Sequence, residues 1–162
     1  MKLYDYMIKL VSSCLDKFAQ IILCVSILLV VSNILLRVFF GSPILGTYEY
    51  VGFCSSLIIG LSLAYCALQN GNIAVEFFHQ KLSPKIQVVT DSIMGIAAFV
   101  FFIFAAWHMS RFAYSMVLSG EVAASTGTPV YYFVYLVTFG ILMLCLVLLS
   151  QIINTIRQVR HK

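Results

Sequence analysis

The stretch Asn70–Lys85, NGNIAVEFFHQKLSPK, is the one sustained polar interruption in the middle of a very apolar chain. Two long apolar runs joined by a Gly/Pro turn precede it. Two more, joined by a Gly/Ser/Thr-rich connection, follow it. Within the stretch, Phe77 and Phe78 offer an apolar side, whereas Glu76 and Lys81 offer a polar one. This pattern predicts a short interfacial helix on the membrane surface, placed between two membrane hairpins.

The composition indicates a membrane protein. Of the 162 residues, 62% are hydrophobic and only 10% are charged, whereas soluble domains are about half apolar and about a quarter charged. A transmembrane helix needs about 20 apolar residues, because each residue advances about 1.5 Å through a hydrocarbon core of about 30 Å. Backbone groups in lipid must be paired internally, so such runs form helices. The runs that meet this test are 18–40, 47–69, 86–111 and 130–153.

We therefore predict an all-α integral membrane protein, with a single membrane domain over residues 1–162 and four transmembrane helices. Near the N-terminus, apolar residues recur at helical spacing, namely Leu3, Met7, Leu10 and Cys14. This spacing predicts an amphipathic helix that lies in the headgroup region and runs into the first span. The apolar run behind it is longer than a signal-peptide core and lacks a small-residue cleavage site, so we expect it to remain a membrane helix.

The basic residues predict the orientation. They gather before the first span, in the central polar stretch and at the end of the chain: Lys2, Lys9, Lys17, Lys81, Lys85, Arg157, Arg160 and Lys162. With four spans these three regions share one side of the membrane, and the positive-inside rule places that side in the cytoplasm. The formal charge of +4 then reflects topology and contact with anionic lipids of the phospholipid bilayer, and no nucleic-acid partner is expected.

Two charged residues flank the turn between the first two spans. Arg37 precedes the turn and Glu49 follows it, so an antiparallel hairpin would place them at similar depth. We expect an ion pair or a water-bridged contact between them near the outer boundary. The alternative is that each side chain extends to the headgroups independently.

The second span carries a small residue at every fourth position: Gly52, Ser56, Gly60 and Ala64. Such a ridge lets another helix approach closely. The facing helix could belong to this chain or to a second protein, and the sequence does not distinguish these cases. Trp107 lies near the outer end of the third span, as interface aromatics do. The residues expected to hold the structure together or to meet a partner are thus Arg37, Glu49, Gly52, Ser56, Gly60, Ala64 and Trp107.

The sequence offers little for chemistry. It has no Gly-rich phosphate loop, nucleophile motif or metal-ligand cluster, and no carboxylate lies at mid-membrane depth. The five cysteines are odd in number and lack metal-ligand spacing, which is typical of apolar packing residues. His108 is the one histidine within a span, whereas a transmembrane b-type haem generally takes two axial ligands. We expect no enzyme activity, no catalytic, substrate-binding or metal site and no cofactor in this chain, which favours an accessory subunit.

Several short motifs follow one another along most of the chain: Arg37 with Phe39–Gly41, Glu49, Gly60–Ala67, NGNIAVEFF, Trp107 and STGTPVYYFVYLVTFG from Ser125. In their order and spacing they resemble the small membrane subunit of the tripartite ATP-independent periplasmic (TRAP) transporters. The length and the four-span layout resemble that family as well. The individual motifs are weak, so the match depends on their succession.

The resemblance implies a bacterial inner-membrane complex in which both termini of this subunit are cytoplasmic. The small subunit binds a large membrane subunit, which holds the substrate site and the sodium ions. A periplasmic substrate-binding protein delivers an organic acid anion, such as a dicarboxylate or sialic acid, to that pair. The small subunit belongs to the static scaffold beside a moving part of the large subunit. The function implied is therefore that of a scaffold subunit in a sodium-coupled symporter.

Two other functions remain open from the residues alone. A membrane-anchor subunit of a respiratory oxidoreductase would bind haem or quinone, and it would need intramembrane ligands that this chain scarcely offers beyond His108. A stand-alone membrane scaffold would need no transport partner. Neighbouring genes would discriminate, because a transporter needs a larger membrane protein and a secreted binding protein, whereas an anchor needs a flavoprotein or an iron–sulfur subunit.

Overall fold

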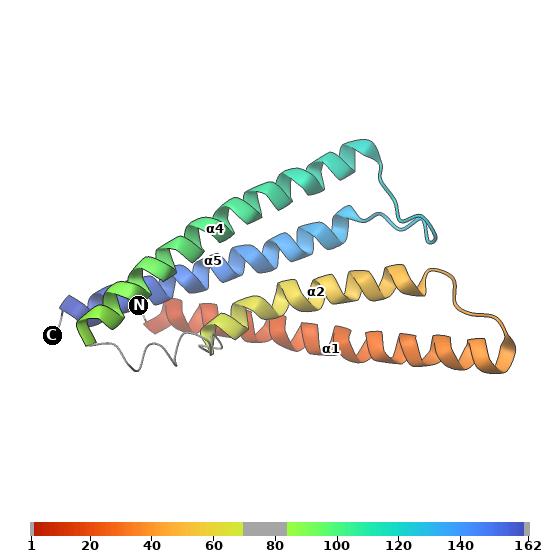
Figure 1. Ribbon diagram of the computed structural model, residues 1–162, viewed down its shortest axis with the longest axis horizontal. Coiled ribbons are helices and arrows are strands. Elements are labelled where there is room, and N and C mark those ends of the chain that lie inside the picture. The colour runs from red at the N-terminus through yellow and green to blue at the C-terminus, as the bar shows by residue number, and fades with distance from the viewer. Residues whose placement is uncertain (1, 70–83, 161–162) are drawn as a thin grey trace.

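The computed structural model describes residues 2–69 and 84–160, with side chains described for residues 6–69, 90 and 92–153. Within these residues the chain forms four helices (Figure 1). They are α1 (Lys2–Phe40), α2 (Thr47–Leu68), α4 (Pro84–Ser119) and α5 (Tyr131–Arg160). Each contains a stretch long and apolar enough to cross a membrane, and no strand occurs in the described part of the chain. The predicted all-α architecture with four spans is therefore confirmed.

The helices extend well beyond the predicted spans at three places, one of which is the inner end of α5, where the helix continues from the predicted end at 153 to Arg160. α1 begins at Lys2, so the expected amphipathic segment and the first span form one continuous helix, and its location in the headgroup region stays a prediction. α4 continues beyond the predicted end at Arg111 to Ser119. No Gly or Pro interrupts that segment before Gly120, whose positive φ of 66° ends the helix. The predicted interfacial helix falls mostly on residues 70–83, which lie outside the described residues.

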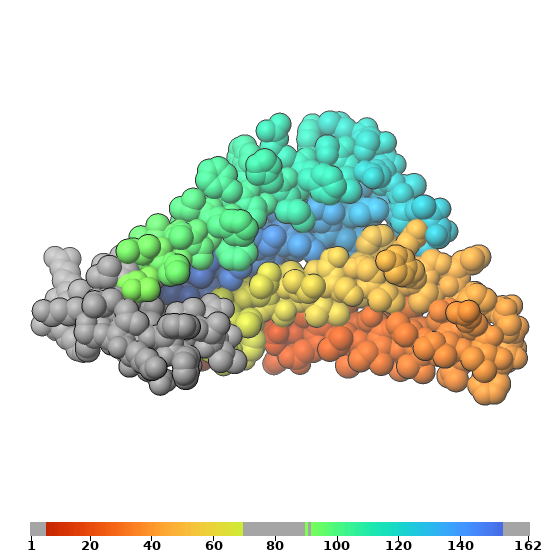
Figure 2. Space-filling view, viewed as in Figure 1, coloured from red at the N-terminus to blue at the C-terminus, as the bar shows by residue number. Residues whose placement is uncertain are grey.

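The four helices lie in a row in the order α4, α5, α2 and α1 (Figure 1). They converge toward the end at which α1 begins and α5 ends, here called the inner end. They spread toward the two turns at the opposite, outer end (Figures 1 and 2). The two middle helices are more enclosed than the outer two. In the most apolar 18-residue stretch of each helix, 39% of the residues are buried in α5 and 22% in α2, against 6% in α4 and none in α1.

The buried side chains gather where α2 meets its two neighbours. One cluster joins α1, α2 and α5 and consists of Ile8, Ala64, Met143, Leu144 and Val147. A second joins α1 and α2 and consists of Ala19, Leu57 and Leu61. Most other large apolar side chains are exposed on the outside of the row. In a bilayer these side chains face lipid, which is as apolar as they are.

Both outer turns are held by local hydrogen bonds. In the turn between α1 and α2, the Ile44 N–H donates to Asn33 Oδ1 at 2.8 Å, and the Thr47 hydroxyl donates to the Ile44 carbonyl at 2.8 Å. In the connection between α4 and α5, the Ala123 N–H donates to the Thr128 carbonyl at 2.9 Å. The latter connection is therefore a closed loop, and its tip lies close to the first turn of α2.

Candidate functional site at the joint between the hairpins

The first hairpin (α1 and α2) and the second (α4 and α5) meet along α2 and α5, and the outermost contact is polar. Glu49, in the first turn of α2, accepts hydrogen bonds from the tip of the α4–α5 loop. The Ser125 N–H donates to Oε1 at 2.7 Å, and the Thr126 N–H and hydroxyl donate to Oε2 at 3.0 and 2.8 Å. Because hydrogen bonds to an ionised group are stronger than neutral ones, this carboxylate links the hairpins firmly at their outer end.

A glycine makes this polar contact possible. Gly46 is the N-cap of α2, has a positive φ of 77° and lies directly against Thr126. A Cβ at Gly46 would overlap the Thr126 side chain, and the left-handed backbone would also be strained in any other residue. The glycine therefore lets the loop approach closely enough for Thr126 to reach Glu49.

Of the contacts predicted for Arg37 and Glu49, the direct ion pair is absent from the described residues, whereas the water-bridged contact stays a prediction. Both oxygens of the Glu49 carboxylate accept hydrogen bonds from Ser125 and Thr126, and the described residues contain no direct ion pair between Arg37 and Glu49. The Arg37 side chain is exposed. Adjacent depth in the hairpin is insufficient for pairing, because the backbone N–H groups of the other hairpin's loop are better placed to satisfy the carboxylate.

The second contact between the hairpins is a close crossing of α2 and α5 through glycines. A Cβ at Gly60 would lie 3.1 Å from the Val137 Cα, and a Cβ at Gly140 would overlap the Gly60 carbonyl oxygen. The two backbones thus touch with no side chain between them. One turn further, Ala64 is completely buried in the core cluster with α5 residues. At Gly60 and Ala64, the helix that faces the ridge is therefore α5 of the same chain.

The third contact lies at the inner end. The Gln151 side chain of α5 donates from Nε2 to the Ala67 carbonyl at 2.7 Å. That carbonyl is in the last turn of α2, where helix carbonyls lack partners in their own helix. The hairpins are thus joined at three heights: by Glu49 at the outer end, by Gly60 and Gly140 in the middle, and by Gln151 at the inner end. We call this set the joint.

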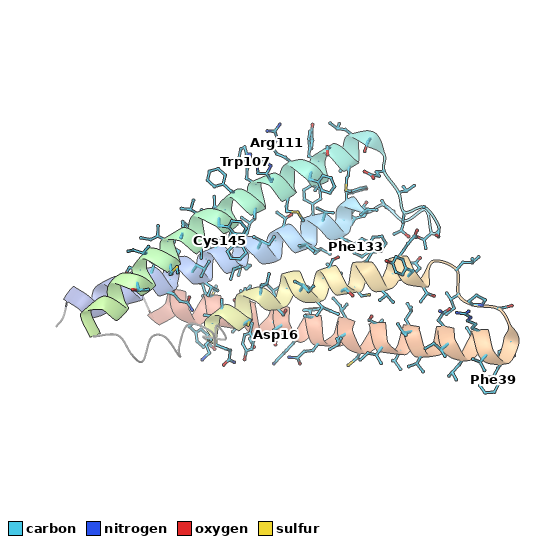
Figure 3. The ribbon with its side chains drawn as sticks, in the orientation of Figure 1. Asp16, Phe39, Trp107, Arg111, Phe133 and Cys145 are labelled. Carbon is cyan, nitrogen blue, oxygen red and sulfur yellow. The ribbon has the colours of Figure 1, made fainter. Side chains whose placement is uncertain are left out.

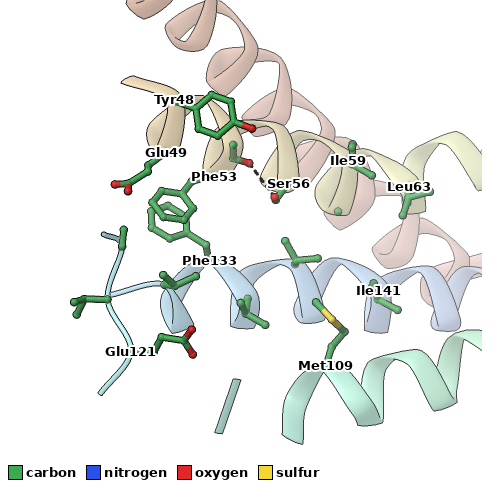
Figure 4. Close-up of a pocket in the computed structure, with 17 residues that line it drawn as sticks. Tyr48, Glu49, Phe53, Ser56, Ile59, Leu63, Met109, Glu121, Phe133 and Ile141 are labelled. Atoms are coloured by element: carbon green, nitrogen blue, oxygen red, sulfur yellow. Dashed lines mark hydrogen bonds between the residues drawn. The ribbon is translucent and has the colours of Figure 1, made fainter. Parts of the chain in front are cut away.

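Between the outer and middle contacts, α2 and α5 separate and leave an apolar groove of about 740 Å³. Phe53 of α2 stacks on Phe133 of α5 across this groove, with ring centroids 4.3 Å apart and planes 6° apart (Figure 4). The groove is also lined by Gly52 and Ser56. A Cβ at Gly52 would meet nothing within 4 Å, and the exposed Ser56 donates its hydroxyl to the Gly52 carbonyl at 2.9 Å.

The predicted site residues therefore fall into three groups. Glu49, Gly60 and Ala64 are in the joint. Gly52 and Ser56 are on the open groove. Arg37 and Trp107 lie apart from both: the Trp107 side chain is 64% exposed and points away from α5 (Figure 3).

The sequence analysis did not predict as site residues those that contact α2 from the second hairpin, although the first four are part of the STGTPVYYFVYLVTFG motif: Ser125, Thr126, Phe133, Gly140 and Gln151. Gly140 alone carried a usable signal, because a glycine inside an apolar helix costs about 1 kcal/mol relative to alanine and usually has a packing reason. It has no small residue four positions away, so the ridge pattern did not mark it.

The joint holds helices together and offers no reactive group. Among the described residues, no group of three His, Cys, Asp or Glu side chains is placed to hold a metal ion. The cysteines are free thiols, and His108 is exposed on α4. The residues present in the joint and the groove are suited to packing and hydrogen bonding.

Of the comparisons with known proteins, the one with protein-family models gave a match. The family model described as "Tripartite ATP-independent periplasmic transporters, DctQ component" matches residues 26–158. This segment contains α2, α4 and nearly all of α5, and it includes every residue of the joint. A search of curated proteins and a search of solved structures found no match.

Proposed function

Because the chain belongs to the DctQ component family of the TRAP transporters, we propose that it is the small scaffold subunit of a sodium-coupled transporter. Family membership and the four apolar helices make it a multi-pass inner-membrane transporter component, and not an enzyme. In the proposed complex, a large membrane subunit holds the sodium ions and the substrate. A periplasmic binding protein delivers an organic acid anion, such as a dicarboxylate or sialic acid.

The joint is the observation that supports a scaffold role. Three contacts at different heights fix the tilt of α2 relative to α5, and each has on at least one side a backbone group, which cannot swing as a side chain does. Among the residues whose side chains the structure describes, Asp and Glu are found only at Asp16, which precedes the predicted first span, and at Glu49 and Glu121 near the outer end. An ion or anion in transit would need polar partners inside the membrane. A rigid subunit without polar groups inside the membrane is suited to supporting a second subunit that carries the transported substrate.

We further propose that the open groove receives a helix of the large subunit. Lipid tails give membrane helices no hydrophobic reason to associate, so their attraction depends on close packing at small residues. Gly52 and Ser56 provide such positions, and they are not occupied by any described helix of this chain. The apolar lining, with Phe53 and Phe133 at its centre, would then pack against the side chains of the incoming helix.

Orientation is the remaining part of the proposal. α1 begins and α5 ends at the same end of the row (Figure 1), and basic residues lie in the first part of α1, at the start of α4 and in the last turns of α5. We therefore place the inner end in the cytoplasm. A cytoplasm-active reporter should be active when fused after Lys162 and silent when inserted near Glu121. The reverse result would invert the orientation.

Neighbouring serines on α2 provide a matched test of the groove. Ser56 lines the groove and Ser55 does not, although both are exposed. Ser56→Leu should strongly reduce co-purification with a tagged large subunit, whereas Ser55→Leu should leave it unchanged. Sodium-dependent uptake of an organic acid into vesicles should fall in parallel. Equal co-purification of both variants would place the partner surface elsewhere, and uptake by this chain alone would contradict the scaffold role.

A further inference from the structure

A second groove lies at the inner end, away from the open groove. It has a volume of about 430 Å³ and is formed by the first part of α1 and the last turns of α2. Its lining residues are Tyr6, Lys9, Leu10, Ser13, Cys14, Lys17 and Tyr65. Nothing in the proposed scaffold function uses these side chains, and their chemistry differs from that of the joint.

The cations of this groove are arranged along one side of α1. Lys9, Ser13 and Lys17 follow one another at every fourth position, which puts the Cα atoms of the two lysines about 12 Å apart along the helix, with Ser13 between them. Neither lysine forms an ion pair with a described residue. The nearby Asp16 is not part of the lining, and it accepts a hydrogen bond from Gln20 Nε2 at 2.8 Å. The groove therefore presents two positive charges that have no ion-pair partner among the side chains that the structure describes, and they favour an anion.

Apolar side chains run beside these cations. Met7 is 56% exposed, Leu10 is 52% exposed and Phe18 is 57% exposed, and the exposed Cys14 lies between them. Their spacing of three or four residues forms a stripe from the groove toward the membrane-spanning part of α1. A small inorganic anion would gain nothing from this stripe. A phospholipid would bind more tightly because of the stripe, since its phosphate can contact the lysines while its acyl chains contact the apolar side chains.

The depth of the groove fits a headgroup. Tyr65 lies about one turn before α2 ends at Leu68, and a helix of 22 residues has nearly the length needed to cross the hydrocarbon core. The groove is thus at the level where the span leaves the hydrocarbon. Tyrosines are enriched at that level, and the Tyr65 hydroxyl accepts a hydrogen bond from Gln69 Nε2 at 2.8 Å while keeping its own proton to donate.

From these observations we infer that this groove binds an anionic phospholipid, such as phosphatidylglycerol. The phosphate lies between Lys9 and Lys17, within reach of the Ser13 hydroxyl, and an acyl chain follows the stripe from Met7 to Phe18. This is a defined site, beyond the general contact of basic residues with the bilayer. It stands independently of the proposed transport function, since it uses none of the residues of the joint or the open groove.

Native mass spectrometry of the purified subunit, or of its complex with the large subunit, tests this inference. Phosphatidylglycerol and phosphatidylcholine with the same acyl chains are titrated against the wild type and two variants. Lys9→Gln combined with Lys17→Gln removes the two cations of the groove. Arg37→Gln combined with Arg111→Gln removes the same charge from exposed residues outside it. Helix content by circular dichroism checks that each variant is folded.

We expect the wild type to retain phosphatidylglycerol in preference to phosphatidylcholine. Each lysine removed should weaken phosphatidylglycerol binding about fivefold, as expected for a basic residue at an anionic surface. The arginine variant should bind like the wild type. Equal loss in both variants would show a net-charge effect and overturn the inference, and so would equal affinity of the wild type for the two lipids.

Two further arms separate a lipid from a free phosphate. Leu10→Ser leaves both lysines in place and interrupts the apolar stripe, so it should weaken binding of the phospholipid. Inorganic phosphate should not displace the lipid, even at concentrations high enough to fill a site that binds free anions. Displacement by phosphate, together with no effect of Leu10→Ser, would assign the groove to a free anion and contradict the lipid site.

Discussion

The two halves of the small-residue ridge on α2 differ although their sequence spacing is identical. Toward the inner end, Gly60 and Ala64 are buried against α5. Toward the outer end, Gly52 and Ser56 are exposed on an apolar groove. A repeat of small residues every fourth position therefore indicates that some helix can approach closely, but it does not say which one. In this chain, half of the ridge is used internally and half remains available to a partner.

The first test of this comparison adds a single methyl group at each half of the ridge, on α5 opposite Gly60 and on α2 at Gly52. Gly140→Ala places a Cβ where the Gly60 carbonyl now lies, so α2 and α5 must separate. We expect a loss of about 3 kcal/mol in the free energy of unfolding, at the upper end for overpacked interiors. Gly52→Ala meets no atom within 4 Å and should change this free energy by less than about 1 kcal/mol, in the favourable direction expected for glycine replaced within a helix.

Reversible unfolding in bicelles or mild detergent, followed by circular dichroism, measures both variants. The order of their effects matters most. If Gly52→Ala destabilised the subunit as much as Gly140→Ala, the outer half of the ridge would also be packed within the chain, and the contrast between the halves would disappear.

The second prediction concerns the polar contact that closes the outer end of the groove. Glu49→Ala removes the acceptors of three hydrogen bonds from Ser125 and Thr126, so the outer ends of the hairpins should separate while the glycine crossing holds. Glu49→Gln retains one carbonyl oxygen and should have an intermediate effect. The thermal midpoint should fall less than in Gly140→Ala, because the contact is at the edge of the structure.

Spin labels at Leu45 and Ala124, both exposed, report the separation in a cysteine-free background. Pulsed electron paramagnetic resonance should show a longer or broader distance between them in Glu49→Ala than in the parent protein. An unchanged distance distribution would mean that Glu49 does not hold the hairpins together.

The smallest effect is expected at Arg37. Its side chain is exposed and makes no ion pair with Glu49, so Arg37→Gln should leave the thermal midpoint of the subunit unchanged. Exchanging the charges, with Arg37→Glu and Glu49→Arg together, should be no more stable than Glu49→Arg alone. Recovery of stability in the double variant would restore direct pairing as the better interpretation.

The span layout was predictable because it depends on local properties. Hydrophobic runs of sufficient length predict membrane helices whatever their partners are, and the second span was placed to within one residue of α2. The ridge was visible for the same reason, as four small residues at one spacing. The end of α4 was placed too early, because Arg111 was taken as the membrane boundary although the helix continues to Gly120, the next residue that can end it.

The joint could not be predicted because its partners are far apart in the sequence. Glu49 and Thr126 are separated by 77 positions, and the loop binds the carboxylate largely through backbone N–H groups, which every residue type except proline possesses. Residue identity therefore says little about that contact. The contact at Gly140 was equally hard to predict. Gly140 contributes by having no side chain, and the need for this appears only when α2 is seen to pack directly against it.

Three attachments along one seam have a mechanical consequence. Two rods fixed at one point can pivot, and two rods fixed at two neighbouring points can still splay at the free end. With Glu49, Gly60–Gly140 and Gln151 distributed along the length of α2 and α5, tilting and lengthwise sliding both strain at least one attachment. The paired helices α2 and α5 therefore resist shear as one rigid unit, and a force that tilts one of them should tilt the other with it.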